Sequence, residues 1–235
     1  MSLSGALNNA VSGMLASQRQ VEVTSGNISN AQTEGFTTKR APTTTQVLDG
    51  RAAGTLVSDI TREGNEFIQR ELRNEQSGLE NAQAKSDVFK RIQDLFGTLD
   101  DDSAITNTLG DLKTRFEELG TEPGNTANRQ QVVRQAESVA RQLNNLSQQT
   151  QELREQADAD IETAVQTVND QLQNLQNLNQ QIANADNSGD PSANLKDKRD
   201  QALQEISQKL EVQTFKRDNG AVSVFTNDGQ PLLNA

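Results

Sequence analysis

The longest regular pattern of hydrophobic and polar positions runs from about Thr126 to Asp186. Apolar side chains recur there in steps of three, four or their sums, which is the spacing of one helix face. At about 1.5 Å per residue, a helix of roughly sixty residues is about 90 Å long. Two positions of this seam are polar, Thr150 and Asn179. The seam predicts a packed bundle core, for which we select Leu143, Leu153, Ile161, Val168, Leu172 and Leu175.

Helical spacing also predicts four shorter helices, over residues 3–23, 64–96, 101–119 and 194–210. Because a long soluble helix needs a partner to cover its apolar face, the helices over 64–96 and 101–119 are candidates within the chain. Gly97 is the expected stop of the former. The chain is therefore predicted to be mainly α, with an elongated antiparallel helical bundle over 64–210.

Two segments lack helical periodicity. Residues 37–63 are rich in Thr, Ala and Gly, and we interpret them as an extended or irregular linker. Residues 211–225 alternate apolar and polar positions on either side of Asn219-Gly220, which predicts a β-hairpin. Because a lone hairpin is rarely stable, we expect residues 211–235 to begin a sheet domain that this sequence leaves incomplete.

The composition favours an extended, solvated structure. Only 32% of residues are hydrophobic and 3% aromatic, which supplies a single wide core poorly. The formal net charge of -11 argues against nucleic acid or an anionic membrane as a partner. We find neither a membrane-spanning run of apolar residues nor a cleavable signal peptide.

The candidate chemistry is sparse. The chain has no His and no Cys, and we find no nucleophile or phosphate-binding motif, so we expect no catalysis, cofactor or metal. Asp100–Asp102 could hold a cation, but we interpret it as an acidic flank of the next helix. The stretch Asp186–Asp190 resembles the beginning of a calcium loop, but it lacks the required glutamate and is better interpreted as a helix-ending turn.

The predicted helix at the amino end carries a narrow apolar stripe that it cannot bury alone. Packing against another subunit is at least as well supported as packing within the chain, and a flexible tail is a third alternative. The helix is followed by a break, Gly26–Phe36, of small polar residues, two glycines and one aromatic. We expect a specific turn in which Gly35 adopts a backbone angle that other residues avoid and Phe36 anchors the exit. Its selected residues are Gly26, Asn27, Asn30, Gly35 and Phe36.

Residues 7–40 resemble the amino-terminal segment of the axial proteins of the bacterial flagellum, those of rod, hook and hook-filament junction. The shared elements are Ser12-Gly13, Asn27–Ala31, Gly35-Phe36 and Lys39-Arg40. Three later stretches, residues 64–97, 120–144 and 194–215, occur in an order that resembles the first hook-filament junction proteins of this family. The first motif indicates only the wider class, whereas the ordered set is specific to the junction members.

The resemblance implies a structural junction protein that is exported by the flagellar type III apparatus with an uncleaved signal and is located outside the cell. Its implied partners are other copies in a homo-oligomeric ring, the hook protein, and the next junction and filament proteins. The residues that would pack in the inner tube are Leu3, Leu7, Val11, Met14, Val21 and Ile28. Family members continue beyond the hairpin and return to a terminal helix, so we expect this chain to be a fragment or a truncated copy.

The resulting domain prediction is an axial helix and turn over 1–36, a linker over 37–63, a bundle over 64–210 and the start of a β-rich domain over 211–235. The alternatives are a hook or rod subunit, a helical surface-interaction or adaptor protein unrelated to motility, and an enzyme. The long seam counts against a hook or rod subunit, and an adaptor gives no reason for the segment 27–36. The missing His and Cys count against an enzyme.

Overall fold

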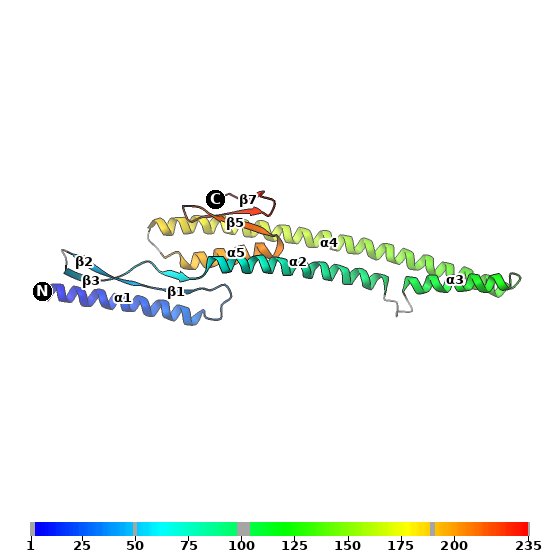
Figure 1. Ribbon diagram of the computed structural model, residues 1–235, viewed down its shortest axis with the longest axis horizontal. Coiled ribbons are helices and arrows are strands. Elements are labelled where there is room, and N and C mark those ends of the chain that lie inside the picture. The colour runs from blue at the N-terminus through cyan, green and yellow to red at the C-terminus, as the bar shows by residue number, and fades with distance from the viewer. Residues whose placement is uncertain (1–2, 49–50, 98–103, 189–190, 235) are drawn as a thin grey trace. The chain divides into compact units, whose positions relative to one another are not determined.

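The computed structural model describes residues 3–48, 51–97, 104–188 and 191–234 (Figure 1). The chain divides into two compact units, one formed by Met1–Gly78 and Val165–Ala235, the other by Leu79–Ala164. The helices are α1 (Leu3–Ser29), α2 (Glu66–Phe96), α3 (Ile105–Thr121), α4 (Thr126–Ser188) and α5 (Ala193–Lys209). The strands are β1 (Thr38–Arg40), β2 (Thr43–Leu48), β3 (Arg51–Val57), β4 (Thr61–Glu63), β5 (Val212–Lys216), β6 (Val222–Thr226) and β7 (Pro231–Leu233). The mainly α fold is confirmed.

The long helix predicted from the apolar seam is confirmed as α4, which has 63 residues. It begins where the side chain of Asn125 accepts hydrogen bonds from the backbone N–H groups of Ala127 (2.9 Å) and Asn128 (3.4 Å). Capping of this kind satisfies donors that have no partner within the first helical turn. The helix α2 ends at Phe96, as predicted, and Gly97 follows with a φ of 73°.

The main hydrophobic core lies between the carboxyl-terminal part of α4, the helix α5 and the sheet β5–β6–β7. Its buried members are Val168, Leu175, Leu203, Ile206, Val212, Val222 and Val224. Two of the six predicted core residues, Val168 and Leu175, belong to this cluster, and Leu172 packs against it. The seam of α4 is therefore covered by apolar neighbours along this stretch.

The predicted core positions of the unit Leu79–Ala164 require a correction. Leu143 is 52% exposed and Ile161 is 61% exposed, while Leu153 is half-buried. Among the described residues of this unit, the buried hydrophobic ones are Ala104, Val132 and Val139. The helix α3 has 17 residues, so it can cover only about 25 Å of a neighbouring helix. A stripe of apolar residues marks a face, but that face is buried only where another element lies against it.

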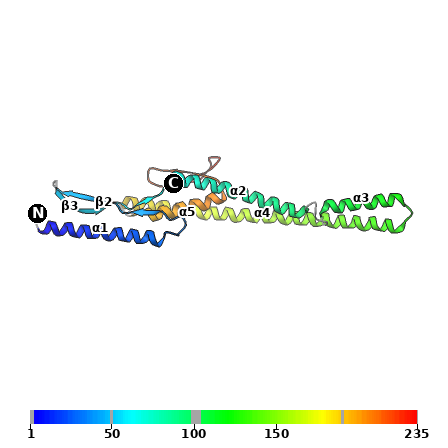
Figure 2. The same cartoon turned by 60° about the horizontal axis from the view of Figure 1, so that its bottom comes forward.

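The segment predicted as an extended or irregular linker forms two antiparallel strand pairs, so it is extended and regular. The strand β1 pairs with β4 in the register Thr38↔Glu63, and β2 pairs with β3 in the register Thr43↔Val57. The register of the second pair shifts between Gln46 and Val47. Both views show β2 and β3 alongside α1 (Figures 1 and 2).

The predicted carboxyl-terminal hairpin is confirmed as β5 and β6, and β7 adds a third antiparallel strand to it. At the turn, Gly220 has a φ of 81°, and the Asn219 side chain accepts a hydrogen bond from the N–H of Ala221. Glycine adopts this left-handed conformation without steric cost.

Asn179, one of the polar seam positions of α4, is buried against β6. Its side-chain N–H donates to the carbonyl of Val222 at 2.9 Å, and its carbonyl accepts from the N–H of Val222 at 3.0 Å. The amide therefore replaces the two hydrogen bonds that a neighbouring strand would offer this residue.

The junction between α4 and α5 is held by Asp186. Its carboxylate accepts hydrogen bonds from Ser192 Oγ (2.5 Å) and Lys196 Nζ (3.1 Å). Partial burial raises the pKa of Asp186, but these hydrogen bonds and the charge of Lys196 outweigh it and lower the pKa below its ordinary value.

Asp100–Asp102, the other cation candidate, lies outside the residues that the structure describes. Among the described residues, no group of three or more His, Cys, Asp and Glu side chains is placed to hold a metal ion. No helix of the described part of the chain is long and apolar enough to cross a membrane.

Candidate assembly surface

One face of α1 presents large apolar side chains to solvent. Their exposed fractions range from 47% at Val11 to 90% at Leu3. The face, which we call the α1 apolar face, comprises Leu3, Leu7, Val11, Met14, Leu15, Val21 and Ile28. It includes all six residues selected from the sequence for tube packing. The described part of the chain leaves these side chains about half exposed or more.

The opposite side of α1 is covered by strands, through small and polar residues. Ala16 is the buried residue of this helix. Ser12 Oγ accepts a hydrogen bond from the N–H of Thr55 on β3 (3.1 Å) and donates one to the carbonyl of Asn9 (3.0 Å). A Cβ added to Gly54 would lie 2.5 Å from Ser12 Oγ, so glycine permits the close approach of β3. The strands dock on α1 without covering its large apolar residues.

The end of α1 lies later in the chain than predicted. The helix continues through Gly26 and Asn27 to Ser29, so these two residues belong to its last turns rather than to a break. Asn30 closes the helix, because its backbone N–H (3.1 Å) and its side-chain N–H (2.9 Å) both donate to the carbonyl of Gly26. The helix extends because the small residues of this stretch are tolerated in a helix, and the turn is left to residues 30–36.

Gly35 in this turn has a φ of 74°, in the left-handed region that favours glycine. A Cβ added there would lie 2.6 Å from the side chain of Gln201 on α5, whose amide donates to the carbonyl of Glu34 at 2.5 Å. The left-handed backbone therefore favours glycine at position 35, and a Cβ there would also displace the Gln201 side chain.

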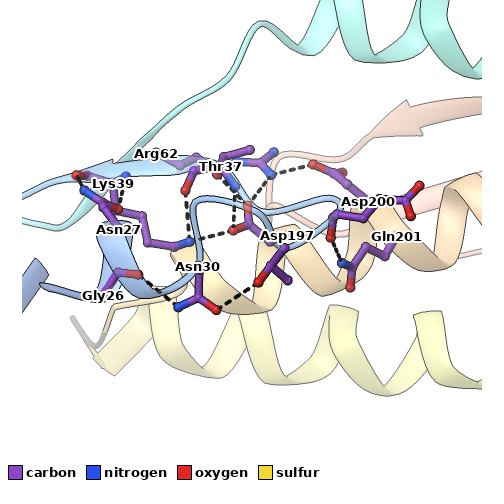
Figure 3. Close-up of polar contacts among 11 residues, drawn as sticks. Gly26, Asn27, Asn30, Thr37, Lys39, Arg62, Asp197, Asp200 and Gln201 are labelled. Carbon is purple, nitrogen blue, oxygen red and sulfur yellow. Dashed lines mark hydrogen bonds and ion pairs between the residues drawn. The ribbon is translucent and has the colours of Figure 1, made fainter. Parts of the chain in front are cut away.

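Asn27 connects the last turn of α1 to β1. Its side-chain N–H donates to the carbonyl of Lys39 (2.8 Å), and its side-chain carbonyl accepts from the N–H of Lys39 (2.9 Å). Figure 3 shows this pairing beside the contact between Asn30 and Gly26. Asn27 thus fixes where the chain returns after the turn.

A buried ion pair then fastens the same segment to α5. Lys39 Nζ lies 2.6 Å from Asp197 Oδ2, and each side chain is only 8% exposed. Asp197 also accepts from Thr37 Oγ1 (2.6 Å) and from the N–H of Thr37 (3.2 Å), as Figure 3 shows. Arg62 on β4 contacts both Asp197 (3.5 Å) and Asp200. We call Thr37, Lys39, Arg62 and Asp197 the exit anchor.

Phe36, which we expected to anchor the exit, is half-buried and contacts the exit anchor itself. The Nζ of Lys39 lies 3.5 Å from the centroid of its ring, a cation–π geometry. The ring therefore supports the buried ammonium group within the same chain.

The sequence indicated only part of this arrangement. The motif Lys39-Arg40 is visible in the sequence, but Asp197 is separated from it by about 160 positions, and the pattern of residues 194–210 predicts only a short helix. One local signal exists, because a buried charged residue needs a partner and Lys39 lies three positions after the aromatic residue Phe36. No spacing rule connects it to a particular carboxylate.

Two family models match separate parts of this chain. Residues 7–37 match the family model of the flagella basal body rod protein, and residues 89–235 match the model of the flagellar hook-associated protein FlgK helical domain. The chain is similar to flagellar hook-associated protein 1 of Escherichia coli (strain K12), with 26% identity over 98% of this chain and 43% of that protein. The protein of the same name from Salmonella typhimurium (strain LT2) is 25% identical over the same shares. The chain thus spans less than half the length of these relatives. Because the FlgK model matches more than half of the chain, the chain belongs to the flagellar hook-associated protein FlgK helical domain family, a family of flagellar structural proteins.

Proposed function

We propose that this chain is a structural subunit of the junction between flagellar hook and filament. The observation that carries the proposal is the α1 apolar face, which lies within the segment that matches the rod protein family. The names of the similar proteins support the place in the hook-filament region. The match of residues 89–235 to the FlgK helical domain favours the junction over a hook or rod subunit.

The proposed mechanism is geometric and involves no reaction. A fully buried Leu, Val or Met side chain contributes about 1.5–3 kcal/mol. The seven side chains of the α1 apolar face are 47% to 90% exposed, so burying what remains would contribute about 7–14 kcal/mol. Association itself costs about 4–15 kcal/mol. Association through a single helix pair would therefore be marginal. In a closed homo-oligomeric ring each subunit contacts two neighbours, so no subunit leaves its α1 apolar face uncovered.

In this proposal the exit anchor determines the orientation of α1. It joins the end of α1 to α5 through Lys39 and Asp197, so α1 is held in a fixed orientation within the unit formed by Met1–Gly78 and Val165–Ala235. Subunits that pack through α1 would then present the rest of the chain in the same way at each position of the ring. In this proposal the neighbours are other copies, the hook protein and the next junction and filament proteins.

We also propose that the protein reaches this position, outside the cell, through the flagellar export apparatus, without a cleaved signal. The segment that resembles the axial proteins and carries the α1 apolar face lies at the amino end, where such a signal would be read. The absence of His and Cys from the sequence supports a role without catalysis.

The proposal is tested by placing a charge on the α1 apolar face. Leu7→Asp and Met14→Asp, each introduced into the full-length protein, are expected to leave the helix content and export unchanged but to prevent incorporation onto isolated hooks. The matched control Thr24→Asp adds the same charge at an exposed polar position of the same helix outside the α1 apolar face, and it should incorporate normally. Normal incorporation of Leu7→Asp and Met14→Asp would refute the packing role. Loss of their export would refute it as well, because the face would then act in export.

Phe36 provides a second test. Because its ring supports the Lys39 ammonium group, Phe36→Ala should weaken hook binding through a misdirected α1. If Phe36→Ala binds the hook normally, the anchor has no part in assembly.

A further inference from the structure

A cluster of cationic side chains surrounds one cavity of the unit formed by Met1–Gly78 and Val165–Ala235. They come from β4, α2, α5 and β5, and are Arg62, Arg70, Arg73, Arg199 and Lys216. Two carboxylates, Glu66 and Asp200, also line this cavity, which leaves an excess of three positive charges. The formal net charge of the whole chain is -11, so this concentration of cations contrasts with the rest of the surface. We call it the arginine cavity.

The two carboxylates are already engaged. Asp200 pairs with Arg62, and Glu66 lies 3.4 Å from Lys216 Nζ. Within the described part of the chain, Arg70, Arg73 and Arg199 therefore have no carboxylate within ion-pair distance. The guanidinium groups outnumber the anions that the chain itself supplies.

Arg199 is a deeply buried member of this cluster. Its side chain is 3% exposed, so it is almost completely removed from water. Its Nη1 donates to the carbonyl of Gly220 at 2.8 Å, but its buried Nε has no hydrogen-bond partner among the described residues. A buried charge is costly, and an anion in the cavity would offset the charge of the Arg199 guanidinium.

The pKa shifts of two groups that line the arginine cavity also indicate an excess of positive charge there. Burial lowers the pKa of the Arg73 guanidinium, and Arg70 and Arg62 lower it further, against the opposing effect of Asp200. Partial burial raises the pKa of Glu66, but Lys216, Arg62 and Arg199 outweigh it and hold the pKa below its ordinary value. The cavity is thus positive enough to stabilise negative charge.

We propose that the arginine cavity is a binding site for a small oxyanion. Guanidinium groups are planar forks that bind carboxylate, phosphate and sulfate oxygens by paired hydrogen bonds. The cavity volume of about 70 Å³ suits a group of that size. The oxyanion is either free phosphate or sulfate, or an acidic side chain of a second copy of this acidic chain. The inference does not rest on the proposed junction role.

The experiment is an isothermal calorimetric titration of the purified full chain with inorganic phosphate. It is carried out at pH 7, and sodium chloride holds the ionic strength constant. The expected result is saturable binding of one phosphate per chain. Arg73→Gln and Arg70→Gln should weaken it about tenfold or more, the factor that corresponds to one hydrogen bond to a charged group. Arg154→Gln, at an exposed position of α4 outside the cavity, is the matched control and should bind as the parent does. Circular dichroism checks that each variant is folded.

Sedimentation of the same samples distinguishes the two sources of the oxyanion. If a second copy supplies a carboxylate, self-association should be weakened by phosphate and by Arg73→Gln, but not by Arg154→Gln. If the site takes a free anion, phosphate should bind without changing sedimentation. Equal phosphate binding by Arg73→Gln and the parent would overturn the proposal. So would the absence of both a saturable isotherm and an Arg73-dependent self-association.

Discussion

Asp197→Asn should detach the segment that follows α1 from α5. The substitution keeps the size of the side chain but removes its charge, and Lys39, which is 8% exposed, loses its anionic partner. Breaking a buried ion pair by removing one member costs about 3–5 kcal/mol. Lys39 retains a hydrogen bond to the carbonyl of Thr37 at 3.1 Å and the ring face of Phe36, so we expect the lower end, about 3 kcal/mol.

The partner substitution, Lys39→Met, should cost less. Asp197 would keep its two hydrogen bonds from Thr37 and its contact with Arg62. The loss is then one hydrogen bond between charged groups, about 1.5–3 kcal/mol. The order of the two effects follows from the number of donors around Asp197, and it is itself part of the prediction.

The measurement is native-state hydrogen exchange over residues 36–41, because the chain has no Trp or Tyr for fluorescence. A loss of about 3 kcal/mol lowers protection about 150-fold, since each 1.4 kcal/mol is a factor of ten. The matched control is Glu63→Gln, which makes the same chemical change in the exposed pair with Arg40 and should cost less than about 1 kcal/mol. If Asp197→Asn has no greater effect than Glu63→Gln, the reasoning about burial is refuted.

Three further predictions concern the stability of the chain. Gly35→Ala should lower the free energy of unfolding by about 1–2 kcal/mol through its left-handed backbone, whereas Gly26→Ala, inside α1 with open space around it, should raise it by up to about 1 kcal/mol. Urea unfolding followed by circular dichroism measures both, and equal effects would contradict the assignment. Leu175→Ala in the closed core should cost about 2–5 kcal/mol, but Leu143→Ala, at a half-exposed position, less than about 1.5 kcal/mol. If Leu143→Ala costs more than Leu175→Ala in the same assay, the assignment of Leu175 to the core is wrong. Because the pKa of Asp186 is lowered in the folded chain, its stabilising contribution is present above the unfolded pKa, near 3.9, and is lost as pH falls through the folded pKa. Asp186→Asn should therefore be less sensitive to acid than the parent when urea unfolding is compared at pH 5 and about pH 3, and an unchanged sensitivity would argue against this carboxylate.

Elements with a strong local period could be predicted from the sequence. The helix α4 could be predicted almost to its ends, because its helical spacing continues over many turns. The hairpin of β5 and β6 was found because alternating residues flank Asn219-Gly220. In both cases the information lies within a short window of the chain.

The strands β1 to β4 and the exit anchor could not be found in this way. The strands β1 and β4 have three residues each, too few to show alternation, and they pair across more than twenty positions. The partner of Lys39 lies 158 positions away, on a helix whose own pattern does not mark Asp197 as buried. Likewise, the seam of α4 showed an apolar face at Leu143 and Ile161, but not whether anything covers it.

Asn179 determines where along α4 the three-stranded sheet can sit. A slide of the helix by one turn, about 5.4 Å, would bring Leu175 or Ala183 against the peptide groups of Val222. That would leave a buried N–H and C=O without partners, at about 1–3 kcal/mol for each group. The leucines and isoleucines of the seam would tolerate many such positions almost equally. The side-chain amide of Asn179 thus fixes a single register between α4 and the sheet.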